Sequence, residues 1–137
     1  MRRVLVWVAT LVAGAGLATA QDFPDIKGTW TGTNEAVVIG NPVHTSNPNA
    51  NSQEPGLTGA ALTLTITGQK GRRFWGTFAS AAGSEPIIGV FRDESTFVIT
   101  DHDGHSTARL LPDGTIELVY QRVGDTMVAA FAHMKRR

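Results

Sequence analysis

The sequence predicts an all-β protein: an eight-stranded antiparallel up-and-down β-barrel that follows an N-terminal signal peptide. Three observations predict it. Apolar and polar residues alternate with a period of two along most of the chain after residue 27, turn residues separate the alternating segments, and helical spacing is scarce. Strands joined by short turns are antiparallel neighbours, and closing eight of them into a barrel removes both exposed edges.

The first 20 residues have the composition of a secretory signal peptide. Met1-Arg2-Arg3 is basic, residues 4–17 are apolar apart from Thr10 and a few small or glycine residues, and Ala18-Thr19-Ala20 has the small residues of a cleavage site. The apolar run of about 14 residues is shorter than the roughly 20 that span a bilayer. We therefore expect no membrane span, export by the Sec route with cleavage after Ala20, and a periplasmic or secreted protein.

Residues 21–137 have the size of one domain, which we expect to be the barrel. Without Arg2 and Arg3 this part carries a formal charge of about −2, and it has no basic stripe to replace the counterions of phosphates. We therefore expect no nucleic-acid partner. The chain has no cysteine, so its core and its backbone ladder alone must stabilise the exported fold.

The first four strands are expected at residues 28–39, 61–67, 73–79 and 86–91. In the second of them, Leu62, Leu64 and Ile66 share one face and threonines take the other, which is the pattern of a half-buried strand. Gly76 and Gly89 lie inside the third and fourth strands. A glycine at such a position marks a sharp bend or the close approach of another group, and both occur in small barrels.

The last four strands are expected at residues 96–100, 105–111, 115–121 and 126–134. Asp103-Gly104 and Asp113-Gly114 are hairpin turns, because Asp-Gly suits the positive φ that these turns need. The one long connection, residues 40–59, is rich in Asn, Pro, Ser and Gly and is expected to be a loop throughout. Both a lid beside the barrel mouth and a mobile excursion stay open for it.

Gly28-Thr29-Trp30, at the head of the first strand of a short-turn meander, resembles the opening of the calycin superfamily, which includes lipocalins, fatty-acid-binding proteins and avidins. In lipocalins this Gly-x-Trp motif packs at the closed end of the barrel against an arginine late in the chain. The resemblance implies this structural role for Trp30, with Arg136 or Arg137 as the arginine. Avidins share the Gly-Thr-Trp opening, but residues 31–35 differ from their biotin-binding segment, so biotin is not the expected ligand.

Aromatic residues at alternating positions of several strands predict an apolar cavity inside the barrel. Such an interior with few polar anchors suits a small hydrophobic or amphipathic ligand, and Arg109 and Tyr120 are the expected anchors. The alternative is a packed barrel with a structural or assembly role. The candidate ligand-binding residues are Phe74, Phe78, Phe91, Phe97, Arg109, Tyr120 and Phe131.

One dense cluster of ionisable side chains, Asp101, His102, Asp103 and His105, offers weak candidate ligands for a metal ion. Their spacing fits no established zinc pattern, and a solvated Asp-Gly turn is the other interpretation. The chain has no cysteine, no Gly-x-Ser-x-Gly elbow and no glycine-rich phosphate loop. We expect binding without catalysis and no cofactor; the alternative is an isomerase-like or cyclase-like barrel enzyme that uses Asp101, His102 or Tyr120.

Two strands are apolar on both faces. Residues 87–91 and residues 127–131 each carry apolar side chains at successive positions. One face of such a strand fills the barrel, and the other must meet a loop or another subunit. A homo-oligomer is therefore a further hypothesis.

Overall fold

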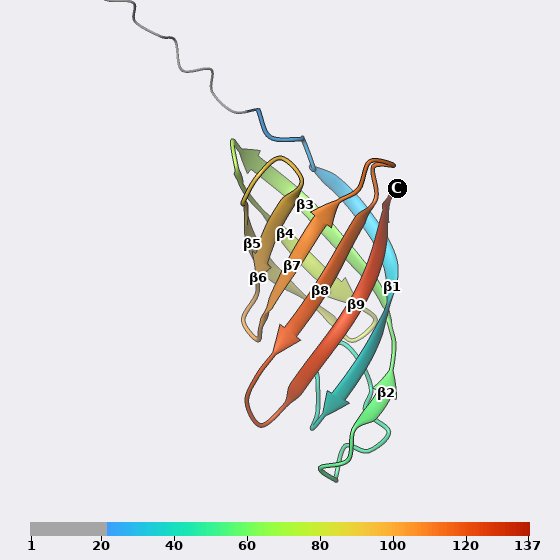
Figure 1. Ribbon diagram of the computed structural model, residues 1–137. Coiled ribbons are helices and arrows are strands. Elements are labelled where there is room, and N and C mark those ends of the chain that lie inside the picture. The colour runs from blue at the N-terminus through green and yellow to red at the C-terminus, as the bar shows by residue number, and fades with distance from the viewer. Residues whose placement is uncertain (1–21) are drawn as a thin grey trace, which may run out of the picture.

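The computed structural model describes residues 22–137 and confirms the predicted fold class, a closed eight-stranded antiparallel barrel with no helix in this range (Figure 1). The predicted signal peptide lies outside the described residues. The strands are β1 Gly28–Ile39, β2 Gly56–Thr58, β3 Ala61–Lys70, β4 Arg73–Ser80, β5 Gly83–Phe91, β6 Thr96–Thr100, β7 His105–Leu110, β8 Ile116–Arg122 and β9 Met127–Arg136.

The barrel closes where the last strand pairs with the first. From β3 to β9 each strand pairs with its neighbours in sequence, and β9 pairs with β1 from Trp30 opposite Arg136 to Ile39 opposite Met127. All of these ladders are antiparallel, so the topology is up-and-down. Residues 22–137 contain no helix long and apolar enough to cross a membrane.

The prediction of a loop throughout residues 40–59 is wrong at β2. β3 pairs with β1 only as far as Thr33 opposite Ala61, so the later part of β1 has a free edge on that side. Gly56–Thr58 pairs with this edge, with Leu57 opposite Val37. Because unpaired backbone groups at an edge are costly, even a three-residue segment is held there.

The strand glycines mark close approaches between neighbouring strands. Gly76 lies against the backbone carbonyl of Thr65 on β3, where a side chain has no room. Gly89 lies under the ring of Phe74 on β4. These contacts explain why two strand interiors carry glycine despite its entropic cost.

One end of the barrel is filled by aromatic side chains. Phe74, Phe91 and Phe97 are buried, and their ring centroids lie 5.0 to 5.7 Å apart in tilted and edge-to-face pairs. Such pairs add about 0.5–1.5 kcal/mol each beyond the burial of their area. We call this end the closed end.

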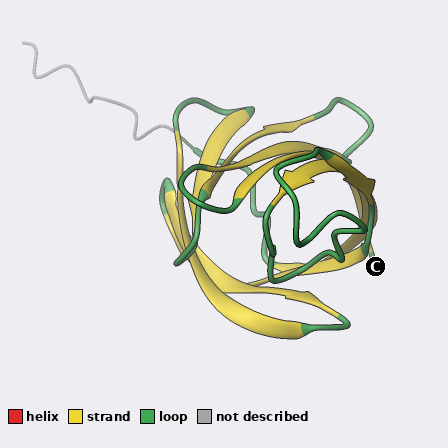
Figure 2. Ribbon diagram, turned by 90° about the horizontal axis from the view of Figure 1, so that it is seen from below, coloured by secondary structure: helices red, strands yellow, loops and turns green. Residues whose placement is uncertain are grey.

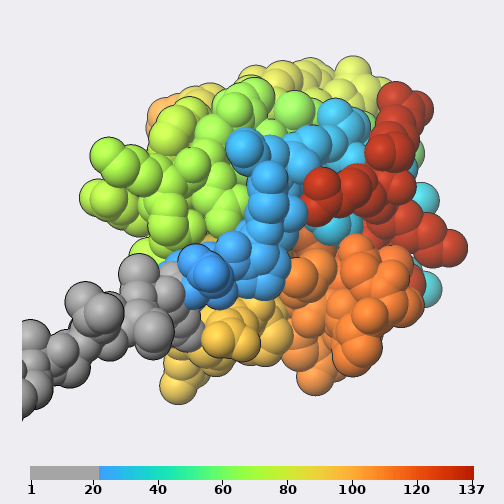
Figure 3. All heavy atoms as spheres, turned by 90° about the horizontal axis from the view of Figure 1, so that it is seen from above, coloured from blue at the N-terminus to red at the C-terminus, as the bar shows by residue number. Residues whose placement is uncertain are grey.

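The segment before β1 lies across the closed end, as the space-filling view in Figure 3 shows. Ile26 is fully buried there, and the ring of Phe23 packs 5.6 Å from that of Phe91. Gln69 of β3 fixes the segment, because its side-chain oxygen accepts a hydrogen bond from the Ile26 N–H and its nitrogen donates to the carbonyl of Pro24. No pattern in the sequence predicts this cover.

Trp30 and Arg136 complete the seal. The indole Nε1 of Trp30 donates to the carbonyl of Ile26 over 3.0 Å, and the guanidinium of Arg136 lies 4.5 Å from the indole ring. Arg136 also donates from Nη1 to the carbonyl of Lys27 and from Nη2 to that of Asp25. The last strand is thereby tied to the segment that leads into the first.

The turn between β5 and β6 gives a prediction about acid stability. Hydrogen bonds from the Thr96 hydroxyl and from the N–H groups of Ser95 and Thr96 lower the pKa of Asp93 from 3.8 to about 2. A carboxylate with a lowered folded-state pKa stabilises the fold above its unfolded pKa, and this contribution is lost as the pH falls from about 4 towards 2. Urea unfolding of wild type and Asp93→Asn should show a weaker decline in stability for the variant across this window. Parallel declines would contradict the prediction.

Candidate ligand-binding site

A cavity lies between two separate groups of buried side chains. The larger group fills the closed end and extends to Leu62, Leu118 and Ala132. The smaller group consists of Ala36, Val38, Val128 and Ala130, with Tyr120 packed against it. Leu62 and Leu118 on one side, and Val128 and Ala130 on the other, line the cavity between them. The side chains of the barrel therefore do not fill the whole interior.

The long connection crosses the open end of the barrel, which we call the mouth. Figure 2 looks into this end and shows the loop across the opening. We call residues 41–55 the mouth loop; Pro42, Val43, His44 and Thr45 of this loop line the cavity. The loop is braced by its own hydrogen bonds, including one from Asn47 to the carbonyl of Gly40 over 2.6 Å.

His44 ties the mouth loop to the barrel wall. Its Nδ1 lies 2.8 Å from the hydroxyl of Ser80, and its Nε2 lies 2.7 Å from Oε1 of Glu85. Its ring meets that of Phe78 edge-on, with centroids 5.7 Å apart. Within residues 22–137, no other side chain of the loop hydrogen-bonds to strands β3 to β9. Among the side chains of the loop, His44 therefore supplies the hydrogen bonds to that wall.

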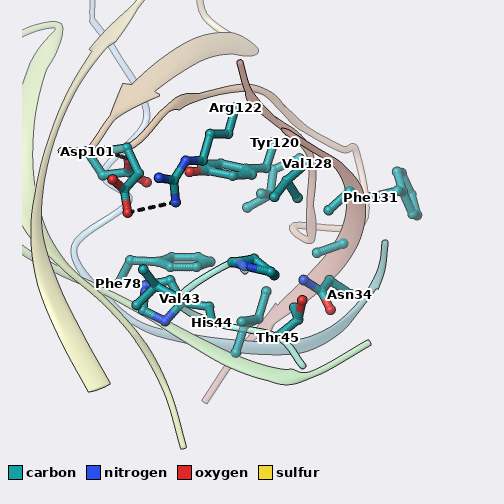
Figure 4. A pocket seen from close by; sticks show the side chains of 16 residues that line it. Asn34, Val43, His44, Thr45, Phe78, Asp101, Tyr120, Arg122, Val128 and Phe131 are labelled. Carbon is teal, nitrogen blue, oxygen red and sulfur yellow. Dashed lines mark hydrogen bonds and ion pairs between the residues drawn. The ribbon is translucent and has the colours of Figure 1, made fainter. Parts of the chain in front are cut away.

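The turn between β6 and β7 places two carboxylates at the mouth. Asp101 accepts hydrogen bonds at Oδ1 from the N–H groups of Asp103 and Gly104, over 2.8 and 2.6 Å. Asp103 is ion-paired with Arg122 of β8, with 3.3 Å between Oδ2 and Nη1 (Figure 4). Oδ2 of Asp101 accepts no hydrogen bond from any described residue.

Tyr120, one of the two predicted polar anchors, lines the cavity. Burial raises the pKa of the Tyr120 hydroxyl above its usual value of 10.0, and the negative charges of Asp101, Asp103 and Glu85 raise it further. The phenol therefore stays protonated at neutral pH and offers an O–H donor to the cavity. Its ring packs against the smaller group of buried residues.

Asn34 and Thr45 place polar atoms at the side of the cavity away from Asp101 (Figure 4). Asn34 is 7% exposed, and its side-chain oxygen accepts a hydrogen bond from the N–H of Ala60 over 2.6 Å. Its amide nitrogen has no hydrogen-bond partner among residues 22–137, and neither has the buried hydroxyl of Thr45. A buried polar atom usually has a partner, so the Thr45 hydroxyl is available to a bound molecule, and the amide nitrogen of Asn34 is free to donate to it as well.

With the mouth loop in this position, the cavity has a volume of about 40 Å³. This is enough for about two or three water molecules. Pockets that hold larger organic ligands measure roughly 300 Å³ or more. A ligand larger than a few atoms therefore requires the mouth loop, and His44 with it, to move outward.

The structure divides the predicted aromatic lining into two parts. Phe78 and Tyr120 line the cavity. Phe74, Phe91 and Phe97 lie in the packed closed end, so these three residues belong to a filled core and do not line the cavity. Trp30 and Arg136, predicted to be structural, pack against each other at that end.

Two of the predicted lining residues, Arg109 and Phe131, do not point their side chains into the cavity. Arg109 is on the outer face of β7, ion-paired with Glu117 of β8 over 2.9 Å. Phe131 borders the cavity, but its ring points away from it, as Figure 4 shows, and the residue is 43% exposed. Alternation along the strands explains why Arg109 and Phe131 face outward, because the residues before them, Ala108 and Ala130, face inward.

The predicted metal candidates do not converge. Asp101 and Asp103 take part in the turn and the ion pair described above, while His102 and His105 are exposed. Within the described part of the chain, no group of three or more His, Asp and Glu side chains is arranged to hold a metal ion. No sequence pattern identifies Asn34, His44 and Arg122 as cavity residues, or Glu85 as the partner of His44, because only the closed barrel brings these residues together.

Comparisons of this chain with family models, curated proteins and solved structures find no match.

Proposed function

We propose that this protein is an exported, calycin-like β-barrel that binds a small amphipathic molecule in the cavity beneath the mouth loop. One observation carries the proposal. The barrel interior is packed at the closed end but leaves an apolar-walled cavity at the mouth, under a loop that His44 hydrogen-bonds to Ser80 of β4 and Glu85 of β5. Cavities of this kind at barrel mouths are ordinary binding sites for small molecules.

The lining supports an amphipathic ligand over a purely apolar one. Leu62, Leu118, Val128, Ala130 and Phe78 supply apolar surface. Polar groups surround it at the mouth, and these belong to Asn34, His44, Thr45, Asp101, Asp103, Tyr120 and Arg122. A molecule with an apolar body and polar ends would satisfy both kinds of surface, whereas a hydrocarbon would leave the polar atoms unpaired.

The chemistry at the mouth supports binding over catalysis. The raised pKa of Tyr120 keeps its phenol protonated, so it is a hydrogen-bond donor and a poor general base. Asp101 is engaged at one oxygen by two backbone N–H groups of its turn. Both residues are suited to orienting a ligand.

Native mass spectrometry tests the proposed function. Protein purified without denaturation from a host that exports it should carry a bound small molecule, which is released on unfolding. The intact mass of the chain also tests cleavage after Ala20. If the protein carries no such molecule, and no member of a panel of small amphipathic compounds raises its melting temperature, the proposed function is wrong.

We also propose that the protein forms a two-fold symmetric dimer through an outer band of β5, β6, β8 and β9. Val90 lies opposite Val98, and Val119 lies opposite Phe131; Thr107 connects the two pairs across β7. These apolar residues are between 37% and 43% exposed. Arg109 and Glu117 lie beside the band. Because their charges are opposite, Arg109 of one copy can face Glu117 of the other across a two-fold axis.

Light scattering tests the dimer. Wild-type protein should have twice the mass of the monomer, and Val119→Glu should be monomeric because a charge is placed inside the apolar contact. The matched control is Val37→Glu, a similarly exposed valine on β1 outside the band, which should leave the mass unchanged. A monomeric wild type at high protein concentration would rule out the dimer.

A further inference from the structure

The charges at the mouth are predominantly negative. Glu85, Asp101 and Asp103 all act on the hydroxyl of Tyr120, opposed by the single guanidinium of Arg122. Arg122 is ion-paired with Asp103, which leaves Asp101 with no cationic partner among the described residues. One carboxylate oxygen of Asp101 is also without a hydrogen bond. The field in this part of the cavity therefore attracts cations.

His44 shows which kind of group these walls accommodate. Its imidazole is a flat ring in edge contact with Phe78, and its two nitrogens lie within hydrogen-bond distance of a carboxylate on Glu85 and a hydroxyl on Ser80. The side chains of His44 and Glu85 are only 16% and 15% exposed. A ring that carries nitrogen is thus seated between an aromatic wall and an acid, within the chain itself.

We infer that the ligand is a small organic cation, a protonated amine or nitrogen heterocycle joined to a compact apolar body, and that it competes with His44 for these walls. This inference rests on the proposed function. The cationic group lies at Asp101 and at Glu85 once His44 has moved. The apolar body lies against Phe78 and the aliphatic wall.

The other side of the cavity sets the orientation of the ligand. The amide nitrogen of Asn34 is a donor and lies away from the carboxylates, as Figure 4 shows. A cation placed beside this N–H group would be repelled, whereas a carbonyl or ether oxygen there would accept its hydrogen bond. The cation therefore points to the turn between β6 and β7.

Calorimetric titration with three molecules of nearly equal shape tests the inference. The probes are 2-phenylethylamine, 2-phenylethanol and phenylacetate, which carry a positive, a neutral and a negative end. The amine should bind to the purified protein about tenfold more tightly than the alcohol, because a charge-assisted hydrogen bond is roughly twice as strong as a neutral one, and phenylacetate should bind most weakly.

Three variants locate the effect. Asp101→Asn keeps an oxygen for the N–H groups of its turn but removes the charge, so it should weaken binding of the amine about tenfold and leave the alcohol unchanged. His44→Ala should strengthen binding of the amine several-fold, because it frees Phe78 and Glu85. Asp93→Asn, the same change in a turn at the closed end, should have no effect on either probe.

The outcomes separate the inference from the proposed function. If the alcohol or phenylacetate binds as tightly as the amine, the ligand is not a cation; the inference is then wrong while the proposed function stands. If the amine binds neither wild type nor His44→Ala, the inference is also wrong, and the proposed function is judged on the molecule found by mass spectrometry. An Asp101→Asn variant that binds the amine as tightly as wild type would also overturn the inference.

Discussion

Replacing Trp30 with alanine should reduce the free energy of unfolding by about 3–5 kcal/mol, the range for a buried large aromatic residue. Trp30 is 1% exposed, its Nε1 donates to the carbonyl of Ile26, and its ring lies under Arg136. The substitution removes the packing, leaves a buried carbonyl without its donor and frees the guanidinium. All three losses occur at the closed end.

Urea unfolding followed by circular dichroism measures this cost. Trp30→Phe keeps a ring but loses the donor, so it should cost about 1–3 kcal/mol, the penalty for an unsatisfied buried acceptor. Trp75→Ala is the matched control, because Trp75 is 48% exposed on the outer face, and it should cost clearly less than Trp30→Ala. Equal costs for the two alanine variants would show that the seal at the closed end does not hold the fold together.

Replacing Ala130 with leucine should weaken ligand binding at least about tenfold, equivalent to about 1.4 kcal/mol, with little change in stability. Ala130 points inward from β9 and lines the cavity. The larger side chain extends into a space of about 40 Å³. It therefore occupies volume that the ligand needs. Because it extends into empty space, it displaces fewer packed neighbours than the same substitution would in a filled core.

The adjacent residue provides the control. Ala129 is on the outer face of β9, so Ala129→Leu makes the same chemical change one position away and should not alter binding. The probe is the molecule that copurifies with the protein, titrated by calorimetry into both variants. Unchanged affinity in Ala130→Leu would place the ligand outside this cavity.

The fold could be predicted from the sequence because its signal is local. Alternation such as that of Leu62, Leu64 and Ile66 specifies one buried face for each strand. Short turns then leave few ways to connect the strands, and closure follows from the cost of free edges. β2 could not be predicted in this way, because Gly56–Thr58 has no alternation and is a strand only because β1 offers it an unpaired edge.

The candidate site was only partly predictable. Tyr120 and Phe78 lie on strands whose faces the alternation fixes, and both line the cavity. Arg109 was expected to point inward, but its inward neighbour is Ala108, and one position decides the side of the barrel. His44 belongs to a loop without periodicity, so its contact with Glu85, 41 residues later, could only come from the folded chain.

The short strand β2 determines which part of the molecule must yield when a ligand enters. The mouth loop leaves the barrel at the end of β1 and returns to that same strand through three paired residues. Both ends of the mouth loop are therefore anchored to β1, so opening at the mouth moves the loop and His44 between these anchors while the closing ladder between β1 and β9 stays paired. The rate of ligand exchange and the resistance of the protein to unfolding thus depend on opposite ends of one strand, so a substitution at either end can change one property without the other.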